Sequence, residues 1–317
     1  MSALLAAGLA LLVVALAAWT LAQGDERTAV IGFIGLGLLL GLAWVQLGAV
    51  DVALTEAAVG GGATGVLLLR AIGALPKGGS TPPGAVDGAP PGVGLRLVIG
   101  VLCALVTLAL AALVLAPQVP APSLAAAAAE PLASTGLGNP VTAVLLAYRA
   151  LDTLLEKVVL LLALIGIWSL APDRLWRGAP APLAPAVPAP PLVFLARTLP
   201  PIGILAGVYL CWTGADHPGG TFQSATILAA MWILVMMAGL REAPETGAPW
   251  LRRLLVFGPA LFIAIGFAGF VVADGFLAYP PGLAKPLIVA IEAALTLSIA
   301  VILGLMVAGR GAREPAR

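Results

Sequence analysis

Nine long apolar runs fill most of this sequence and decide what it can fold into. A helix needs about 20 apolar residues to cross the hydrocarbon core of a membrane, and each run supplies roughly that many. The runs cover residues 3–22, 28–47, 51–73, 94–116, 141–170, 193–212, 222–240, 252–276 and 284–308. Only 10% of the residues are charged, against about a quarter in soluble domains. The sequence therefore predicts an all-α, polytopic membrane protein with about nine transmembrane helices.

The charges between the runs predict the orientation of the helices. With the N-terminus outside, 13 of the 16 lysines and arginines fall on the inside, and only Lys285 falls in an outside loop. The inside set is Arg27, Arg70, Lys77, Arg96, Arg174, Arg177, Arg197, Arg241, Arg252, Arg253, Arg310, Arg313 and Arg317. This asymmetry follows the positive-inside rule, so we expect the N-terminus outside and the C-terminus inside the cell membrane. Residues 3–22 lack a basic start and are expected to stay as the first helix rather than be cleaved.

The remaining composition argues against several classes of function. A net charge of +1 leaves no strongly basic surface for nucleic acid. One histidine, and two cysteines without a CxxC spacing, give no metal-binding pattern. No nucleophile motif accompanies the histidine. We therefore expect neither a catalytic motif, a metal site nor a cofactor in this chain.

Four charged residues interrupt the fifth run, NPVTAVLLAYRALDTLLEKVVLLLALIGIWSL, residues 139–170. An ionisable residue at bilayer depth is costly and marks a functional site by default. In a continuous helix, Arg149, Asp152 and Glu156 share one face, and Lys157 lies one position round. Two interpretations are open. The charges form either a neutral ion-pair cluster that fixes helix packing, or a hydrated relay for protons or cations in which Glu156 titrates.

Two further carboxylates lie within apolar runs without a cation near them in sequence. Glu56 lies more than one turn into the third run, and Glu292 lies about two turns into the last. Each must pair across helices or serve ion movement. Asp51, at the start of the third run, is placed to stabilise a helix N-terminus through the helix dipole.

The loop GADHPGGTFQSAT, residues 214–226, holds the only histidine, His217. A solvated or structural histidine and a proton-entry residue are both compatible with this outside position. The run from Pro218 to Gly220 predicts a turn, and Thr221 is placed to cap the next helix. Lys285 is expected to anchor its helix at the membrane interface.

Shifts in composition divide the chain into modules. The Pro- and Ala-rich stretch 178–191 predicts a semi-rigid linker between five spans and four. The Pro/Gly-rich stretch 74–93 predicts a mobile loop. The expected transmembrane modules are residues 1–75, 94–172 and 192–310.

Small residues are concentrated in the first module. The pairs Gly37-xxx-Gly41 and Gly61-xxx-Gly65 predict close helix approach. The run of three glycines that includes Gly61 is not followed by the Lys-Ser/Thr of a phosphate loop. We therefore predict a packing role for it.

These segments resemble a known family. Residues 28–73, with AVIGFIGLGLLLGLAWVQLGAVDVALTEAAVGGGATGVLLL, resemble the MbhD-type module of membrane-bound hydrogenases and Mrp cation/proton antiporters. Residues 139–170 resemble the MbhE-type module, most specifically in YRALDTLLEK. Residues 193–309, with LARTLPPIGILAGVYLCWTGADHPGGTFQSATILAA, resemble the MnhB/MrpB-type protein of these antiporters.

The resemblance implies a subunit of a hetero-oligomeric membrane complex that exchanges sodium or potassium for protons. Its partners are expected to be other Mrp- or Mbh-type membrane subunits. The motif match carries over Asp51, Glu56, Arg149, Asp152, Glu156 and His217 as functional positions. Lys157 occupies a position that we expect to be apolar in the family. The large antiporter-like domain that precedes the MbhD- and MbhE-type modules in the largest Mrp protein is not found in this sequence, so we expect the chain to be part of a pump.

Three hypotheses follow. In the first, Glu56, Asp152 and Glu156 carry protons or coordinate a cation and Arg149 adjusts their proton affinity. Asp51, Lys157, Glu292 and His217 are further candidate residues for translocation. In the second, the chain is a structural scaffold of a hydrogenase- or complex I-like membrane arm without its own ion path. The third, a self-sufficient transporter, calls for internal inverted repeats that the sequence does not show.

Overall fold

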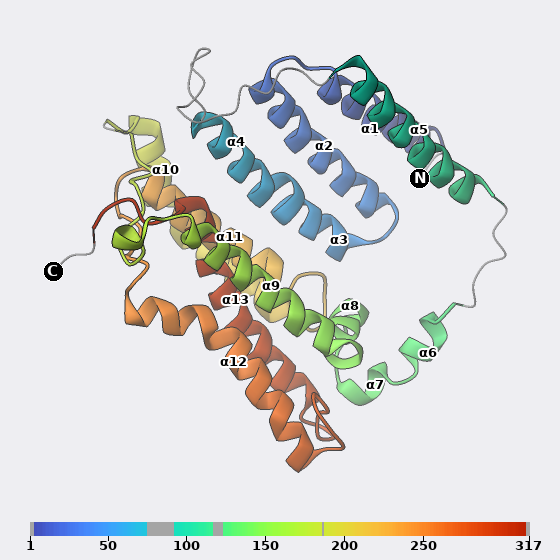
Figure 1. Ribbon diagram of the computed structural model, residues 1–317. Coiled ribbons are helices and arrows are strands. Elements are labelled where there is room, and N and C mark those ends of the chain that lie inside the picture. The colour runs from blue at the N-terminus through green and yellow to red at the C-terminus, as the bar shows by residue number, and fades with distance from the viewer. Residues whose placement is uncertain (1–2, 75–91, 117–122, 186, 315–317) are drawn as a thin grey trace. The chain divides into compact units, whose positions relative to one another are not determined.

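The computed structural model describes residues 3–74, 92–116, 123–185 and 187–314 (Figure 1). Over these ranges the chain is helical, with one isolated β-bridge between Pro180 and Gly311 and no β-strand. It divides into two compact units. The larger unit comprises Met1–Gly73 with Ala129–Arg317, and the smaller comprises Ala74–Ala128. The predicted mobile loop at 74–93 lies almost entirely outside the described residues.

The larger unit has three parts, which follow one another along the chain. Its first part contains α1 (Ala3–Leu21), α2 (Glu26–Gln46), α3 (Val50–Thr55), the π-helix η1 (Glu56–Ala63) and α4 (Thr64–Ala74). Its middle part contains α7 (Leu132–Thr135), α8 (Pro140–Ala143), the π-helix η2 (Val144–Tyr148), α9 (Ala150–Ser169) and the 3₁₀ turn η3 (Asp173–Leu175). Its last part contains α10 (Pro190–Thr213), α11 (Thr221–Met237), α12 (Pro249–Val272) and α13 (Ala284–Ala308). The smaller unit contains α5 (Val93–Leu115) and most of α6 (Ala125–Ala129).

Seven helical stretches in the described ranges are long and apolar enough to cross a membrane. They are Leu4–Leu21, Glu26–Gln46, Val50–Gly73, Val93–Leu113, Pro190–Thr213, Pro249–Val272 and Ala284–Ala308. Two predicted runs are not among them. The helix α11 has 17 residues, and the run 141–170 is divided and carries the charged cluster. The all-helical membrane fold is confirmed, and the count of nine spans stays a prediction.

The prediction of one continuous helix over 141–170 is wrong. The backbone leaves the helical region at Arg149, where φ is −127° and ψ is 37°. The break frees backbone carbonyls that need new donors. The Thr153 hydroxyl donates to the Leu145 carbonyl over 2.6 Å, and the Tyr279 hydroxyl donates to the Leu146 carbonyl over 2.8 Å. These two bonds explain how a helix in an apolar setting tolerates the break.

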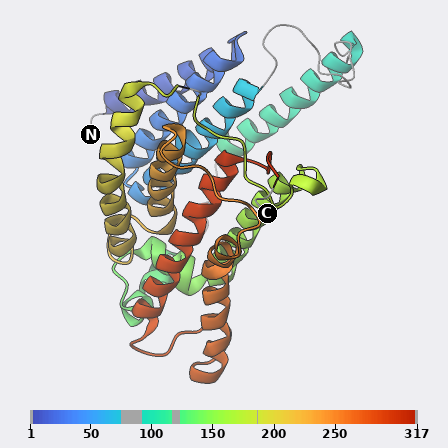
Figure 2. The same ribbon diagram turned by 90° about the vertical axis from the view of Figure 1, so that its left-hand side faces the viewer.

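The helix α13 is the most buried of the seven candidate spans. In Figures 1 and 2 it lies, in red, among α9, α11 and α12, and it contacts all three. Its apolar side chains, such as Ile288 and Leu295, are fully buried in the main core cluster with residues of α8, η2, α9, α11 and α12. The polar residues Glu292, Thr296 and Ser298 of α13 are buried as well, so they face protein rather than lipid.

Glycines allow α2 to pack closely on η1 and α4, in line with the predicted close helix approach. A Cβ added to Gly37 would lie 3.1 Å from the Cα of Gly61. One added to Gly65 would meet the side chain of Ile34 at 2.5 Å. A larger residue at these positions therefore separates the two helices, which confirms a packing role for the small-xxx-small pairs.

The predicted linker is attached to the rest of the larger unit at its first residues. The Thr246 amide donates to the Gly178 carbonyl, and the Ala312 amide donates to the Ala179 carbonyl. The isolated bridge between Pro180 and Gly311 lies beside these bonds. The start of 178–191 is therefore held by the α11–α12 loop and by the segment after α13.

Candidate functional site

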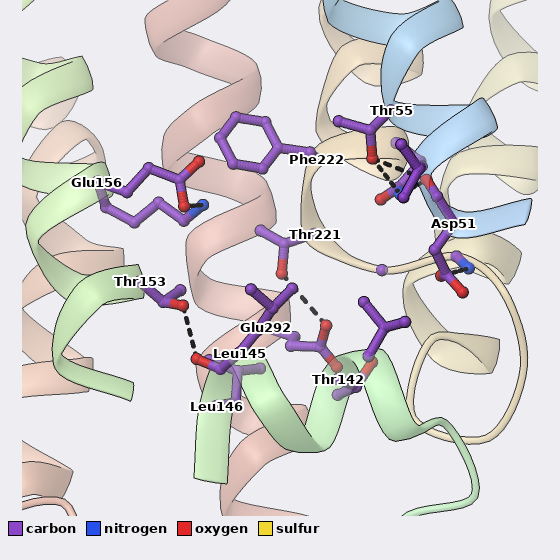
Figure 3. Close-up of a pocket in the computed structure, with 16 residues that line it drawn as sticks. Asp51, Thr55, Thr142, Leu145, Leu146, Thr153, Glu156, Thr221, Phe222 and Glu292 are labelled. Carbon is purple, nitrogen blue, oxygen red and sulfur yellow. Dashed lines mark hydrogen bonds and ion pairs between the residues drawn. The ribbon is translucent and has the colours of Figure 1, made fainter. Parts of the chain in front are cut away.

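A cavity of about 290 Å³ lies where the first, middle and last parts of the larger unit meet (Figure 3). Its walls come from α3, α8, η2, α9, α11 and α13. The lining residues are Asp51, Val52, Thr55, Val141, Thr142, Leu145, Leu146, Thr153, Glu156, Lys157, Gly219, Gly220, Thr221, Phe222, Gln223 and Glu292. Four of them are ionisable, so the cavity brings together charges that are far apart in sequence.

Asp51 joins all three parts of the chain. Its Oδ1 accepts hydrogen bonds from the Gly219 amide at 3.0 Å and from Asn139 Nδ2 at 3.3 Å. The Gln223 amide nitrogen donates to the Asp51 backbone carbonyl and, at 2.9 Å, to the Thr55 hydroxyl. Asp51 therefore does more than stabilise the start of α3, because it also holds the loop before α11 and the start of α8.

Glu292 lies inside the protein, with a side chain that is 3% exposed. The Thr221 hydroxyl donates to Glu292 Oε1 at 3.4 Å. The other oxygen, Oε2, is buried and has no hydrogen-bond partner among the described residues. This oxygen is therefore able to accept a further hydrogen bond inside the protein.

The backbone brings the start of α11 close to Glu292. Gly220 has φ 116° and ψ −162°, which is a conformation that favours glycine. A Cβ at this position would lie 3.2 Å from Glu292 Oε1. The predicted Gly-Gly turn therefore lets α11 begin against a carboxylate, where the positive end of its helix dipole is favourable.

Lys157 faces the cavity, whereas its neighbour Glu156 reaches the outer surface. The Lys157 side chain is 3% exposed and that of Glu156 is 52% exposed. Lys157 Nζ lies 3.3 Å from Glu156 Oε2 and 3.6 Å from the centre of the Phe222 ring. The ammonium group is thus held by an ion pair and a cation–π contact at the cavity wall.

Arg149 and Asp152 form an ion pair outside the cavity. Their side chains are 71% and 57% exposed, and neither lines the cavity. Because the helix breaks at Arg149, the predicted single stripe of Arg149, Asp152 and Glu156 does not form on one continuous helix.

Glu56, the first residue of η1, is half-buried and does not line the cavity. Its carboxylate lies against Gly60 of its own helix, and a Cβ at Gly37 of α2 would be 3.4 Å from its Oε1. Within the described ranges no ion pair to Glu56 occurs. The glycine faces of α2 and η1 therefore make room for this carboxylate.

His217 contributes to the site through its backbone. Its side chain is exposed, while its carbonyl accepts a 3.0 Å hydrogen bond from Asn139 Nδ2. Beside it, Lys285 Nζ pairs with both Asp216 oxygens at 2.7 and 2.8 Å. The hydrogen bond from Lys285 lowers the pKa of Asp216 below its usual value. Lys285 thus joins the loop to α13 by an exposed ion pair.

Asn139 and Gln223 were missed as site residues. Asn139 Oδ1 accepts from the Val141 amide and so caps α8, while Nδ2 donates to Asp51. Gln223 is buried near the start of α11 and donates to Thr55. An Asn-Pro pair is typical of a helix start, and a glutamine opening an apolar helix is a polar residue at membrane depth. Both signals were present in the sequence.

Two family models match the chain. The MbhD model, which describes the D component of MBH, matches residues 11–77. A domain related to the MnhB subunit of a Na⁺/H⁺ antiporter matches residues 191–312. No curated protein matches the chain significantly. The resemblance of residues 139–170 to the MbhE-type module stays a prediction.

Two solved structures are similar to the chain. One is the Mrp complex from Dietzia sp. DQ12-45-1b, with 26% identity, a TM-score of 0.72, and coverage of 98% of this chain and 35% of that chain. The other is the membrane-bound sulfane sulfur reductase, an archaeal respiratory membrane complex, with 26% identity, a TM-score of 0.51, and coverage of 67% of this chain and 98% of that chain. This chain therefore spans about a third of its match in the Mrp complex.

The apolar helices and the buried charges define a multi-pass membrane protein with a polar interior. The two family models and the match to the Mrp complex show that the chain is similar to components of Mrp-type antiporters and has an MbhD-like module. The same findings support a location in the plasma membrane.

Proposed function

We propose that this chain is a membrane subunit of a multisubunit Mrp-type cation/proton antiporter, or of a related ion-pumping complex. It crosses the membrane nine times, with its N-terminus outside and its C-terminus inside. Its modules are an MbhD-like part at 1–75, an MbhE-like part at 94–172 and an MnhB-like part at 192–310, joined by the linker 178–191. It works with other Mrp- or Mbh-type membrane subunits and has no catalytic activity of its own.

The cavity is the observation that carries this proposal. Its ionisable residues come from all three proposed modules: Asp51 from the first, Glu156 and Lys157 from the second, and Glu292 from the third. Ionisable side chains that face a cavity within a membrane protein mark ion pathways and proton relays. The complex moves sodium or potassium and protons, and this cavity is the part of their path that lies in this chain.

The remaining candidates lie around the cavity. The Arg149–Asp152 pair is on the exposed face of α9, where an unpartnered charge is costly in lipid. A partner subunit covers this face. Glu56 lies beside the glycine faces of the first module and His217 lies at the outside loop; they are entry points to the same path.

Antiport by the whole complex tests this function. The complex is expressed in cells that lack their own antiporters, and collapse of a pH gradient on addition of Na⁺ or K⁺ is measured in everted vesicles. Glu156→Gln removes a titratable group but keeps the shape of the side chain, so it should abolish antiport and leave assembly intact. Glu130→Gln changes an exposed carboxylate outside the spans and is the matched control.

A scaffold protein is the second candidate, and the bonds of Asp51 favour it. This side chain joins segments 88 and 168 residues away, which is typical of a structural role. In that case Glu156→Gln would be silent, and replacing Arg149 or Asp152 would disrupt assembly first. A self-sufficient transporter is tested with the purified chain in liposomes, where we expect no cation-dependent pH change.

A further inference from the structure

Lys157 contacts the exposed acid Glu156 and shares a cavity with the buried acid Glu292. Its neighbour Glu156 is half exposed on the outer face of α9, while its own side chain is enclosed. Its ammonium group contacts Glu156 and the face of the Phe222 ring, and Glu292 lies across the same cavity. Lys157 therefore contacts Glu156 and lines the same cavity as Glu292.

The charges of the cavity do not balance. Three acids, Asp51, Glu156 and Glu292, and one base, Lys157, are its ionisable lining residues. Glu156 is half exposed whereas Glu292 is buried, so an uncompensated negative charge is least favourable at Glu292. Glu292 Oε2 has no hydrogen-bond partner among the described residues, which leaves it free to accept a proton.

Asp51 is less suited than Glu292 to accept a proton, because hydrogen bonds hold its carboxylate in place. Its Oδ1 accepts from the Gly219 amide and from Asn139, which are fixed donors. Glu292 Oε1 accepts the longer bond from the Thr221 hydroxyl, which can rotate, and Oε2 has no hydrogen-bond partner among the described residues. The structure therefore leaves Glu292, rather than Asp51, as the inner partner of a mobile ammonium group.

We propose, on the basis of the function above, that Lys157 carries protons between Glu156 and Glu292. The ammonium group swings on its flexible stem from Glu156 toward Glu292 and gives its proton to the Glu292 carboxylate. This leaves a neutral amine and a carboxylic acid. The amine returns to Glu156, which has taken up a proton at the exposed face, and accepts that proton. Glu156 is again a carboxylate, Lys157 is again an ammonium, and one proton has moved to Glu292.

Three substitutions at Lys157 test the proposal in the assembled complex. Lys157→Arg keeps a positive charge that does not dissociate, and Lys157→Met removes the charge. Both should lower antiport at least tenfold at every pH while assembly on native gels is unchanged. Lys157→His restores a group that releases a proton at about pH 6.5, so it should retain part of the activity with an optimum at lower pH. Lys285→Met, outside the cavity, should keep at least half of native antiport.

The outcomes are distinct. If Lys157→Arg retains more than half of native antiport, a fixed charge is sufficient and the proposal is overturned. It is also overturned if the methionine variant is active, or if the assembled histidine variant is as inactive as the methionine variant. If the native complex shows no antiport, the proposed function has failed instead. A methionine variant that does not assemble leaves the arginine and histidine variants to decide.

Discussion

Lys157 and the Arg149–Asp152 pair come from one stretch of sequence, but the fold places them in different surroundings. Lys157 is enclosed at the wall of a cavity that it shares with Glu292. Arg149 and Asp152 pair with each other on the outer face. Charges in one apolar run can thus serve two purposes, since Asp152 and Lys157 are five residues apart on α9 and point to different sides of that helix. The inner group is placed for ion movement and the outer pair for contact with partners.

The largest expected effect is a loss of antiport when a cavity residue, but not a residue of the Arg149–Asp152 pair, is replaced. Glu292→Gln should reduce antiport at least tenfold, because the amide cannot release a proton. Asp152→Asn should retain more than half of antiport wherever the complex assembles, because it does not line the cavity. Antiport per assembled complex is the measurement. Equal losses in the two variants would remove the distinction between inner and outer charges.

A second prediction concerns the stability of the inner group. Asp51→Ala leaves the Gly219 amide without its acceptor, at a cost of about 1–3 kcal/mol for a buried donor, while Asn139 Nδ2 keeps its bonds to the Gly214 and His217 carbonyls. Thermal unfolding of the complex in detergent measures the change. Asp51→Asn keeps an oxygen that can accept from Gly219 and should lose less. A fully stable alanine variant would show that these bonds do not hold the three parts together.

The helix break at Arg149 depends on a hydrogen bond that one substitution removes. Thr153→Val removes the hydroxyl that satisfies the Leu145 carbonyl and should destabilise the protein by about 1 kcal/mol. Thr198→Val is the control, because its hydroxyl bonds to carbonyls of its own continuous helix. Similar melting temperatures for both variants would mean that the Leu145 carbonyl finds another donor.

The smallest effect is expected at the exposed pair of Asp216 and Lys285. Because the folded state lowers the pKa of Asp216, the pair stabilises the protein above the usual pKa of 3.8 and loses this effect as the pH falls through the lower, folded value. Screening keeps the gain below about 1 kcal/mol. The melting temperature of Asp216→Asn should lie slightly below the native one at pH 6, and the difference should vanish in stronger acid. A constant difference would assign it to another cause.

The apolar runs predicted the helical membrane fold and the glycine pairs predicted close helix approach, because both depend on local spacing. The residues Glu292 and Lys157 were also found, as charges within apolar runs. The sequence could not predict that both residues line one cavity, because this depends on how α9 and α13 pack. The break at Arg149 was missed since the run is apolar on both sides, and its stabilising donors, Thr153 and Tyr279, lie outside any local pattern.

A density map of the whole complex in lipid nanodiscs tests the central claim most directly. We expect Asp51, Lys157 and Glu292 inside the lipid slab, around ordered water or a bound cation that reaches Glu292 Oε2. A dry space filled by apolar side chains of a partner, or a position of these residues beyond the lipid headgroups, would contradict the assignment of an ion path to this chain.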